Sequence, residues 1–173
     1  FYMGAQIGLW SYTIRYAMQE LGKNEDDASV YYLASIILFS SSRFVFTALM
    51  KYVTPRRLLF IASVLGVLCT LVVIYGTGMV GVIALVLASG CMSLMFPTIY
   101  GLGMQKLGND AKIGGSGLIM AILGGAVLTS VQGMVSDSFG SINISFYVPL
   151  VCFLVVALYS RVQKNLQSKV ITN

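Results

Sequence analysis

Six long apolar stretches, separated by short polar breaks, run through this chain of 173 residues. They cover roughly residues 1–19, 28–50, 58–76, 79–104, 113–135 and 144–161. A helix needs about 20 mostly apolar residues to cross the hydrocarbon core of a bilayer. The stretches are too long for strands and do not alternate with a period of two residues, so they favour helices. The sequence therefore predicts an all-α membrane protein with a bundle of six transmembrane helices over 1–162 and a cytoplasmic tail over 163–173.

The composition excludes an ordinary soluble domain. Hydrophobic residues make up 57% of the chain and charged residues only 10%, whereas soluble domains carry about 25% charged residues. The chain begins at Phe1 inside an apolar stretch, without an initiator Met or a charged segment before it. We therefore expect it to be a fragment whose upstream part lies elsewhere.

The cations alternate between the two sides of the predicted bundle. The breaks after the second and fourth stretches, together with the tail, hold Lys51, Arg56, Arg57, Lys106, Lys112, Arg161, Lys164 and Lys169. The other three breaks hold only Lys23. Loops rich in Lys and Arg face the cytoplasm, so this pattern predicts that both ends of the chain are cytoplasmic. It also disfavours a nucleic-acid-binding patch, which would not follow the helix ends.

A weak internal repeat joins the two halves of the chain. The segment 47–54 ends the second stretch, and the segment 133–140 ends the fifth stretch at an offset of 86 residues. The two segments fall on opposite sides of the membrane. This arrangement is typical of two inverted three-helix repeats.

Catalytic and metal chemistry has little support in this sequence. The chain has no His, which removes His-based general bases and His metal sites. Cys69, Cys91 and Cys152 are far apart in apolar stretches, where thiols usually act as small packing groups. We therefore expect no enzyme, no metal and no cofactor.

Several motifs together resemble one transporter family. They are Gly4-Ala5-Gln6 followed by Trp10 to Ala17, Phe96 to Gly103, and Gly124-Gly125-Ala126 leading to Gly133 to Asp137. They are similar to the fucose permease branch of the major facilitator superfamily. The resemblance implies the C-terminal half of a twelve-helix transporter, with helices seven to twelve present.

The same resemblance implies a function. It indicates proton-coupled uptake of fucose or a related hexose by alternating access in a bacterial inner membrane. Sugar, proton and lipid bilayer are then the partners, the proton-coupling acids lie in the missing N-terminal half, and the full-length protein is a monomer.

Gln6 and Trp10 are the first candidates for sugar contact. They lie one turn apart on one face of the first predicted helix, where an indole can stack on a sugar ring and an amide can bond its hydroxyls. The resemblance adds that helix seven of similar facilitators supplies a sugar-binding Gln. The alternative is that Gln6 bonds a neighbouring helix and Trp10 fills a packing gap.

Pro97 interrupts the fourth apolar stretch. Proline removes a backbone hydrogen bond and kinks a helix, and irregular backbone at membrane depth often lines a cavity. We therefore expect Thr98 and Tyr100 to be candidates for substrate contact. A purely structural kink is the alternative.

Small residues recur at every fourth position of the fifth stretch: Gly117, Ala121, Gly125, Thr129 and Gly133. Such a stripe lets two helices approach closely. Packing is the simpler interpretation, and a sliding surface for alternating access is the alternative.

Four charged residues are candidates for gating or structural roles. Arg43 lies within the second stretch, where a charge is costly and usually paired or functional. Its expected partner is a backbone carbonyl, water or the missing half, and a snorkelling structural role stays open. Arg56 and Arg57 fit the superfamily's loop motif, which the segment 47–57 keeps only in part. Asp137 ends the G-x-x-x-D segment.

A complete six-helix channel, a membrane enzyme and a non-transporting membrane scaffold are the alternatives to a transporter half. The paired Asn-Pro-Ala turns of aquaporin-type channels do not occur in the sequence. The small-residue stripe, the interrupted fourth stretch and the Gln6–Trp10 face argue against a scaffold.

Overall fold

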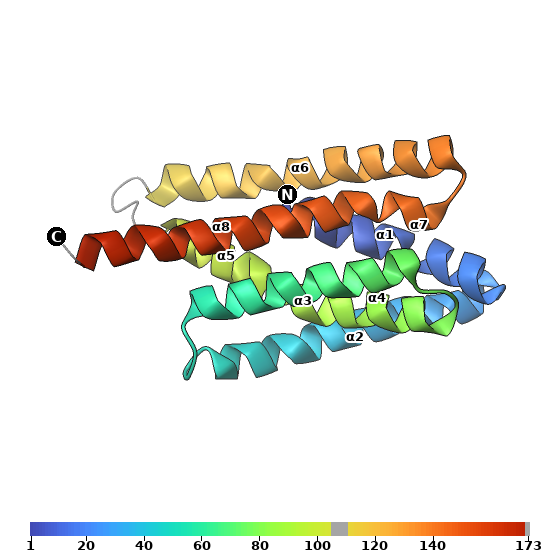
Figure 1. Ribbon diagram of the computed structural model, residues 1–173, viewed down its shortest axis with the longest axis horizontal. Helices are drawn as coiled ribbons and strands as arrows, with labels where there is room; N and C mark the ends of the chain where they lie inside the picture. Colours follow the sequence, from blue (N-terminus) through green and yellow to red (C-terminus); the bar gives the residue numbers. More distant parts are fainter. Residues whose placement is uncertain (105–110, 172–173) are drawn as a thin grey trace.

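The computed structural model describes residues 1–104 and 111–171, with side chains placed up to residue 162 except at 111–113, 118 and 121. The described chain is helical throughout (Figure 1). Its helices are α1 (Tyr2–Leu21), α2 (Glu25–Leu49), α3 (Pro55–Tyr75), α4 (Met79–Met92), α5 (Met95–Met104), α6 (Ala111–Phe139), α7 (Ile142–Ser145) and α8 (Tyr147–Ile171). Lys106, Asp110 and the stretch 105–110 lie outside the described residues, as do the side chains of Lys112, Lys164 and Lys169.

Five helical segments of the described chain are long and apolar enough to cross a membrane. They are Glu25–Leu49, Pro55–Tyr75, Met79–Met104, Gly114–Phe139 and Ile142–Val162. The first predicted span corresponds to α1, which has 20 residues but is not among the five. Polar residues such as Gln6 and Arg15 lower its hydropathy.

The position of α1 explains how it tolerates this polarity. It lies in the middle of the bundle, where it packs against α2, α4, α6 and α8. A helix surrounded by protein needs less apolar surface than one surrounded by lipid. The chain is thus an all-helical bundle of apolar, membrane-length helices around a more polar central helix.

The helices divide into a packed group and two flanking helices. α3 packs against both α4 and α8 to form the most extensive interfaces of the bundle. By contrast, only 6% of the residues in the apolar 18-residue segment of α2 are buried inside the molecule, and only 12% of those in the corresponding segment of α6. Figure 1 shows α6 along one edge of the molecule and α2 along the opposite edge. Both flanking helices therefore present large apolar surfaces outward.

The fourth span is two helices rather than one kinked helix. α4 ends at Met92, two turn residues follow, and α5 begins at Met95. Pro97 accounts for the position of the break, because it has no N–H to bond the carbonyl four residues earlier and its ring crowds that carbonyl. That carbonyl belongs to Ser93, at the break itself.

α1 and α6 pack through complementary notches and side chains. A side chain on Gly4 would collide with Leu128, and one on Gly8 would collide with Gln132. Because the contacts advance in the same direction along both helices, α1 and α6 run parallel. The notches are the close approach that small residues permit between membrane helices.

Part of the small-residue stripe on α6 packs against α1. A side chain on Gly125 would collide with Ile7 of α1, and one on Gly133 would lie 3.1 Å from the Tyr12 hydroxyl oxygen. Nothing lies within 4 Å of the same position on Gly117, and the side chain of Ala121 is outside the described set. The central and C-terminal parts of the stripe therefore pack on α1.

Candidate functional site

Trp10 is held at the junction of three helices. Its indole N–H donates to the Ser89 hydroxyl of α4 at 3.3 Å. Its ring meets Phe39 of α2 edge-on, with 5.0 Å between the ring centroids and an angle of 79°. The side chain is half-buried, so part of the fixed ring remains accessible for stacking.

Gln6 lies one turn before Trp10 on α1 and is also half-buried. Within the part of the chain that the structure describes, its side-chain amide forms no hydrogen bond. The packing alternative for this pair has Gln6 bonding a neighbouring helix and Trp10 filling a gap. In the structure Trp10 forms the bond to a neighbouring helix, whereas the Gln6 amide keeps its hydrogen-bonding capacity for another group.

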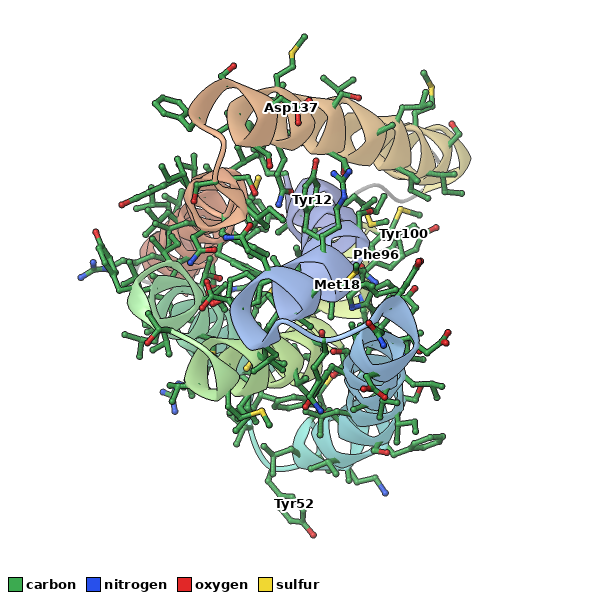
Figure 2. All side chains as sticks on the ribbon, turned by 90° about the vertical axis from the view of Figure 1, so that its right-hand side faces the viewer. Tyr12, Met18, Tyr52, Phe96, Tyr100 and Asp137 are labelled. Atoms are coloured by element: carbon green, nitrogen blue, oxygen red, sulfur yellow. The ribbon has the colours of Figure 1, made fainter. Side chains whose placement is uncertain are left out.

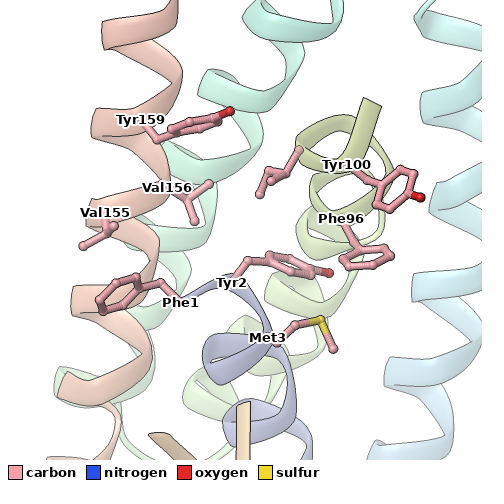
Figure 3. A pocket seen from close by; sticks show the side chains of 9 residues that line it. Phe1, Tyr2, Met3, Phe96, Tyr100, Val155, Val156 and Tyr159 are labelled. Carbon is pink, nitrogen blue, oxygen red and sulfur yellow. The ribbon is translucent and has the colours of Figure 1, made fainter. Parts of the chain in front are cut away.

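A cavity of about 220 Å³ lies between the start of α1, α5 and α8. Figure 3 shows its lining, which is Phe1, Tyr2, Met3, Phe96, Ile99, Tyr100, Val155, Val156 and Tyr159. Aromatic rings run along one side, with centroid distances of 6.2 Å from Tyr2 to Phe96 and 6.2 Å from Phe96 to Tyr100. The cavity is therefore apolar and aromatic, with tyrosine hydroxyls as its polar groups.

One of the four candidate substrate residues lies in the lining of this cavity. Tyr100 lines the cavity, whereas Gln6 and Trp10 do not. Thr98 is 4% exposed, and its hydroxyl donates to the Leu94 carbonyl at 2.8 Å within the helix. The Thr98 hydroxyl proton is therefore used within the helix, next to the break.

The break between α4 and α5 is tied to α1. The buried Tyr2 hydroxyl donates to the Met92 carbonyl at 2.9 Å, at the last residue of α4. The Ser93 hydroxyl, 1% exposed, has no hydrogen-bond partner among the described residues. The buried break therefore holds one hydrogen-bonded carbonyl, that of Met92, and one hydroxyl without a partner among the described residues, that of Ser93.

Arg43 lies on the exposed side of α2. Among the described residues it forms no salt bridge. The arginine is therefore available to a group outside this bundle.

The remaining gating candidates lie toward the two ends of the molecule. Arg57 is exposed near the start of α3, and the Arg56 carbonyl accepts a hydrogen bond from the Ser160 hydroxyl of α8 at 3.0 Å. Asp137 is exposed on α6, one turn beyond Gly133. Figure 2 shows Tyr12 on α1, below the helix that carries Asp137.

Sequence reasoning missed a polar network at the far end of α1. One Glu20 oxygen accepts the Gly78 backbone N–H at 2.8 Å, and the other accepts the Asn143 amide at 3.0 Å. The Tyr16 hydroxyl donates to the Val73 carbonyl at 2.8 Å near the end of α3. Glu20 therefore connects the turn before α4 with the start of α7. No motif signals this network, since its members come from three separate breaks.

The described residues contain no group of three or more His, Cys, Asp or Glu side chains placed to hold a metal ion. The polar side chains of the candidate site suit hydrogen bonding, and its aromatic rings suit stacking.

Comparison with known proteins gives close relatives, although no family profile matches the chain. The chain is 40% identical over 164 residues to an L-fucose-proton symporter of Haemophilus influenzae. It is 38% identical over 161 residues to an L-fucose-proton symporter of Escherichia coli. A glucose/galactose transporter of Brucella abortus is 29% identical over 164 residues.

These matches cover nearly all of this chain but only part of each relative. The two symporters are matched over 92% of this chain and over 38% and 37% of their own lengths. The crystal structure of FucP, a major facilitator superfamily transporter in the outward conformation, superposes with a TM-score of 0.90 at 38% identity. That match covers 92% of this chain and 39% of FucP.

Proposed function

We propose that this chain, a homologue of the L-fucose-proton symporters with the fold of a major facilitator transporter, is the C-terminal half of a proton-coupled importer of fucose or a related hexose. The observation that carries the proposal is the 38% identity and TM-score of 0.90 to FucP over 92% of the chain. Because the chain spans less than two-fifths of its relatives, activity, substrate and coupling belong to the full-length protein.

The outward surfaces of α2 and α6 support the assignment as a half. Secondary transporters of this type rock one bundle against another around a central site. In α2 and α6 only 6% and 12% of the residues in the apolar membrane-length segments are buried. Both helices therefore leave wide apolar faces for a second bundle. In this proposal α1 to α3 and α4 to α8 are inverted three-helix repeats, and the complete transporter acts as a monomer.

We assign sugar contact to Gln6 and Trp10, with Tyr100 as a further candidate. The Gln6 amide has unused hydrogen-bonding capacity, and the Trp10 ring is fixed by Ser89 and Phe39 with part of its surface accessible. Thr98 has a supporting role at the break near Pro97, because its hydroxyl is bonded within the helix.

Arg43 is assigned to conformational gating. A charge within a membrane span needs a partner or a wet cavity, and Arg43 forms no salt bridge among the described residues. A carboxylate of the other half would pair with it in one conformation and release it in another. Arg56 and Arg57 near the start of α3, and Asp137 near the end of α6, are assigned to gating as well. Gly125 and Gly133 keep α6 close to α1.

The orientation follows from the distribution of Lys and Arg. We propose that both ends of the chain face the cytoplasm across a bacterial inner membrane, which places Glu20 and Asn143 at the outer surface.

Uptake by the full-length protein tests the proposed function. Labelled fucose, galactose and glucose are offered to proteoliposomes at two external pH values with a constant internal pH. Accumulation of at least one of these hexoses, driven by an inward proton gradient and abolished by a protonophore, is the expected result. Equal, non-accumulating fluxes with and without the gradient would contradict proton coupling, and the absence of all three fluxes would contradict the substrate class.

A further inference from the structure

The exposed residues of the central helix α1 gather on one side of its second half. They are Ser11, Arg15, Met18 and Gln19. Because residues three and four positions apart are neighbours on a helix surface, these four share one face. All residues of α1 from 2 to 10 are buried or half-buried. We call the exposed residues the open face of α1.

The open face lies between the two flanking helices. α1 packs against α4 and α8 in the interior and against α2 and α6 at the flanks. Figure 2, which looks onto the end where α1 leads into α2, shows α1 between α6 and α2, with Tyr12 and Met18 labelled on it. The open face therefore belongs to the side of the bundle that the proposed function gives to the second half of the transporter.

Arg15 places a fixed positive charge on the open face. Its guanidinium carbon lies 5.9 Å from the centroid of the Tyr12 ring, which is a cation–π distance. Tyr12 is itself buried, and its hydroxyl oxygen lies 3.1 Å from the position of a Cβ on Gly133 of α6. Asp137 follows one turn later on α6, yet Arg15 forms no salt bridge among the described residues. The ring that holds the guanidinium is thus fixed by packing, and the charge is not paired.

The same charge is close to the proposed sugar contacts. Arg15 follows Trp10 by five residues on α1, which is a rise of about 7.5 Å. In the proposed orientation, Arg15 lies between Trp10 and the outer surface. A sugar that moves along the open face to Trp10 therefore comes within about 10 Å of the guanidinium.

We propose that Arg15 is a specificity-determining residue that selects among sugars by charge. It lowers the affinity for protonated amino sugars and raises the affinity for hexuronates, relative to an uncharged residue at the same position. The selection rests on the proposed function, since it presupposes a sugar path along α1. Two unit charges about 10 Å apart change an affinity about 2- to 16-fold as the effective dielectric constant falls from about 80 to about 20.

The experiment compares three competitors that share one ring: galactose, galactosamine and galacturonate. Each inhibits counterflow of labelled hexose in proteoliposomes of the full-length protein at about pH 6 on both sides, where the amine is protonated and the carboxyl ionised. Counterflow needs no proton gradient, so the result is independent of proton coupling. The parent is compared with Arg15→Gln and with Arg15→Lys, which keeps the charge. Lys51→Gln removes a cation from the exposed turn between α2 and α3 and is the matched control.

The readout is the inhibition constant of each charged sugar divided by that of galactose. In Arg15→Gln the ratio for galactosamine should fall about 2- to 16-fold and the ratio for galacturonate should rise. Arg15→Lys and Lys51→Gln should keep the ratios of the parent. Opposite shifts for a cation and an anion are the signature of charge, because damage to the fold would move both ratios in the same direction.

Two further results separate this inference from the proposed function. Hexose counterflow in the parent, with both ratios unchanged or shifted in the same direction in Arg15→Gln, would overturn the role of Arg15 alone. Absence of hexose counterflow and of hexose binding in the parent would overturn the proposed function together with the inference. Where Arg15→Gln is folded by size-exclusion elution but does not transport, the same ratios are measured by competition against equilibrium binding of labelled hexose.

Discussion

The side-chain amide of Gln132 on α6 occupies the space that a side chain on Gly8 of α1 would need. Gln132 is fully buried, and neither its Nε2 nor its Oε1 has a hydrogen-bond partner among the described residues. Pro149 of α8 packs against the same glycine, at 3.6 Å from the position of its missing Cβ. Three helices therefore meet around a buried polar group that is not compensated.

Removal of this amide is expected to stabilise the protein. A buried polar group without a partner costs about 1–3 kcal/mol, and Gln132→Met keeps most of the side-chain length without the polar atoms. We expect a higher thermal unfolding temperature in detergent for Gln132→Met. Gly8→Ala should lower it, because overpacking costs about 1–3 kcal/mol.

A conservative change at Met134, which is 70% exposed on the same helix, supplies the control. Met134→Leu should leave the unfolding temperature unchanged. A lower unfolding temperature in Gln132→Met would show that the amide has a partner, such as a bound water, and would reverse this interpretation.

Glu20→Gln is expected to destabilise the outer end of the bundle. The Glu20 carboxylate accepts hydrogen bonds from Gly78 and Asn143, and hydrogen bonds to charged groups contribute about 1.5–3 kcal/mol. Glutamine removes the charge, and one end of its amide cannot accept. The measurement is thermal unfolding of the full-length protein in detergent.

Glu25→Gln is the matched comparison. Glu25 is exposed in the first turn of α2, where a negative charge interacts with the helix dipole and contributes about 0.3–1 kcal/mol. The loss of stability should therefore be smaller than for Glu20→Gln. Equal losses in the two variants would show that the Glu20 network contributes little.

The family and the helical architecture were predictable from the sequence. The apolar stretches specify helices because a membrane-length run of apolar residues has no other stable arrangement. The resemblance carried by Gly4 to Ala17 and Phe96 to Gly103 is confirmed by the symporter relatives. The central place of α1 was not predictable, since hydropathy describes one helix at a time and does not order the helices.

The contacts of the candidate site depend on packing between distant segments. Trp10 and Ser89 are 79 positions apart, and Glu20 and Asn143 are 123 positions apart. No periodicity links such pairs, so the sequence offered Trp10 as a sugar contact without its bond to Ser89.

Gln6→Ala is expected to weaken sugar binding by the full-length protein. Loss of one satisfied hydrogen bond costs about 0.5–1.5 kcal/mol, which raises the apparent dissociation constant about 2- to 13-fold. Equilibrium binding of labelled sugar to purified protein measures the effect. Ile61→Ala on α3, a position 53% exposed, should bind like the parent. Unchanged binding in both Gln6→Ala and Trp10→Ala would assign the two residues to packing.

The proposed orientation predicts which positions react with a membrane-impermeant thiol reagent in intact cells. Single cysteines at Asn24, Thr77 and Ser141 should be labelled from outside, whereas one at Thr54 should not. These four positions lie in the turns between helices. Asn109 is expected to be protected as well and lies outside the described residues. Labelling at Thr54 in intact cells would reverse the orientation.

Proton coupling is expected to depend on the missing half rather than on this one. A coupling group must gain and lose a proton within the translocation path. This chain has no His, the side chain whose unperturbed pKa lies nearest neutrality. A carboxylate could serve if burial raised its pKa, so the positions of the acids decide the question.

The acids that the structure describes lie near the ends of helices. Glu25, Asp26, Asp27 and Asp137 are exposed, while both Glu20 oxygens accept hydrogen bonds. Asp110 lies outside the described residues. Neutralising these six acids one at a time should therefore leave proton-driven accumulation intact when it is normalised to the amount of folded protein. If one change abolished accumulation but spared exchange of sugar across the membrane, the coupling group would lie in this half.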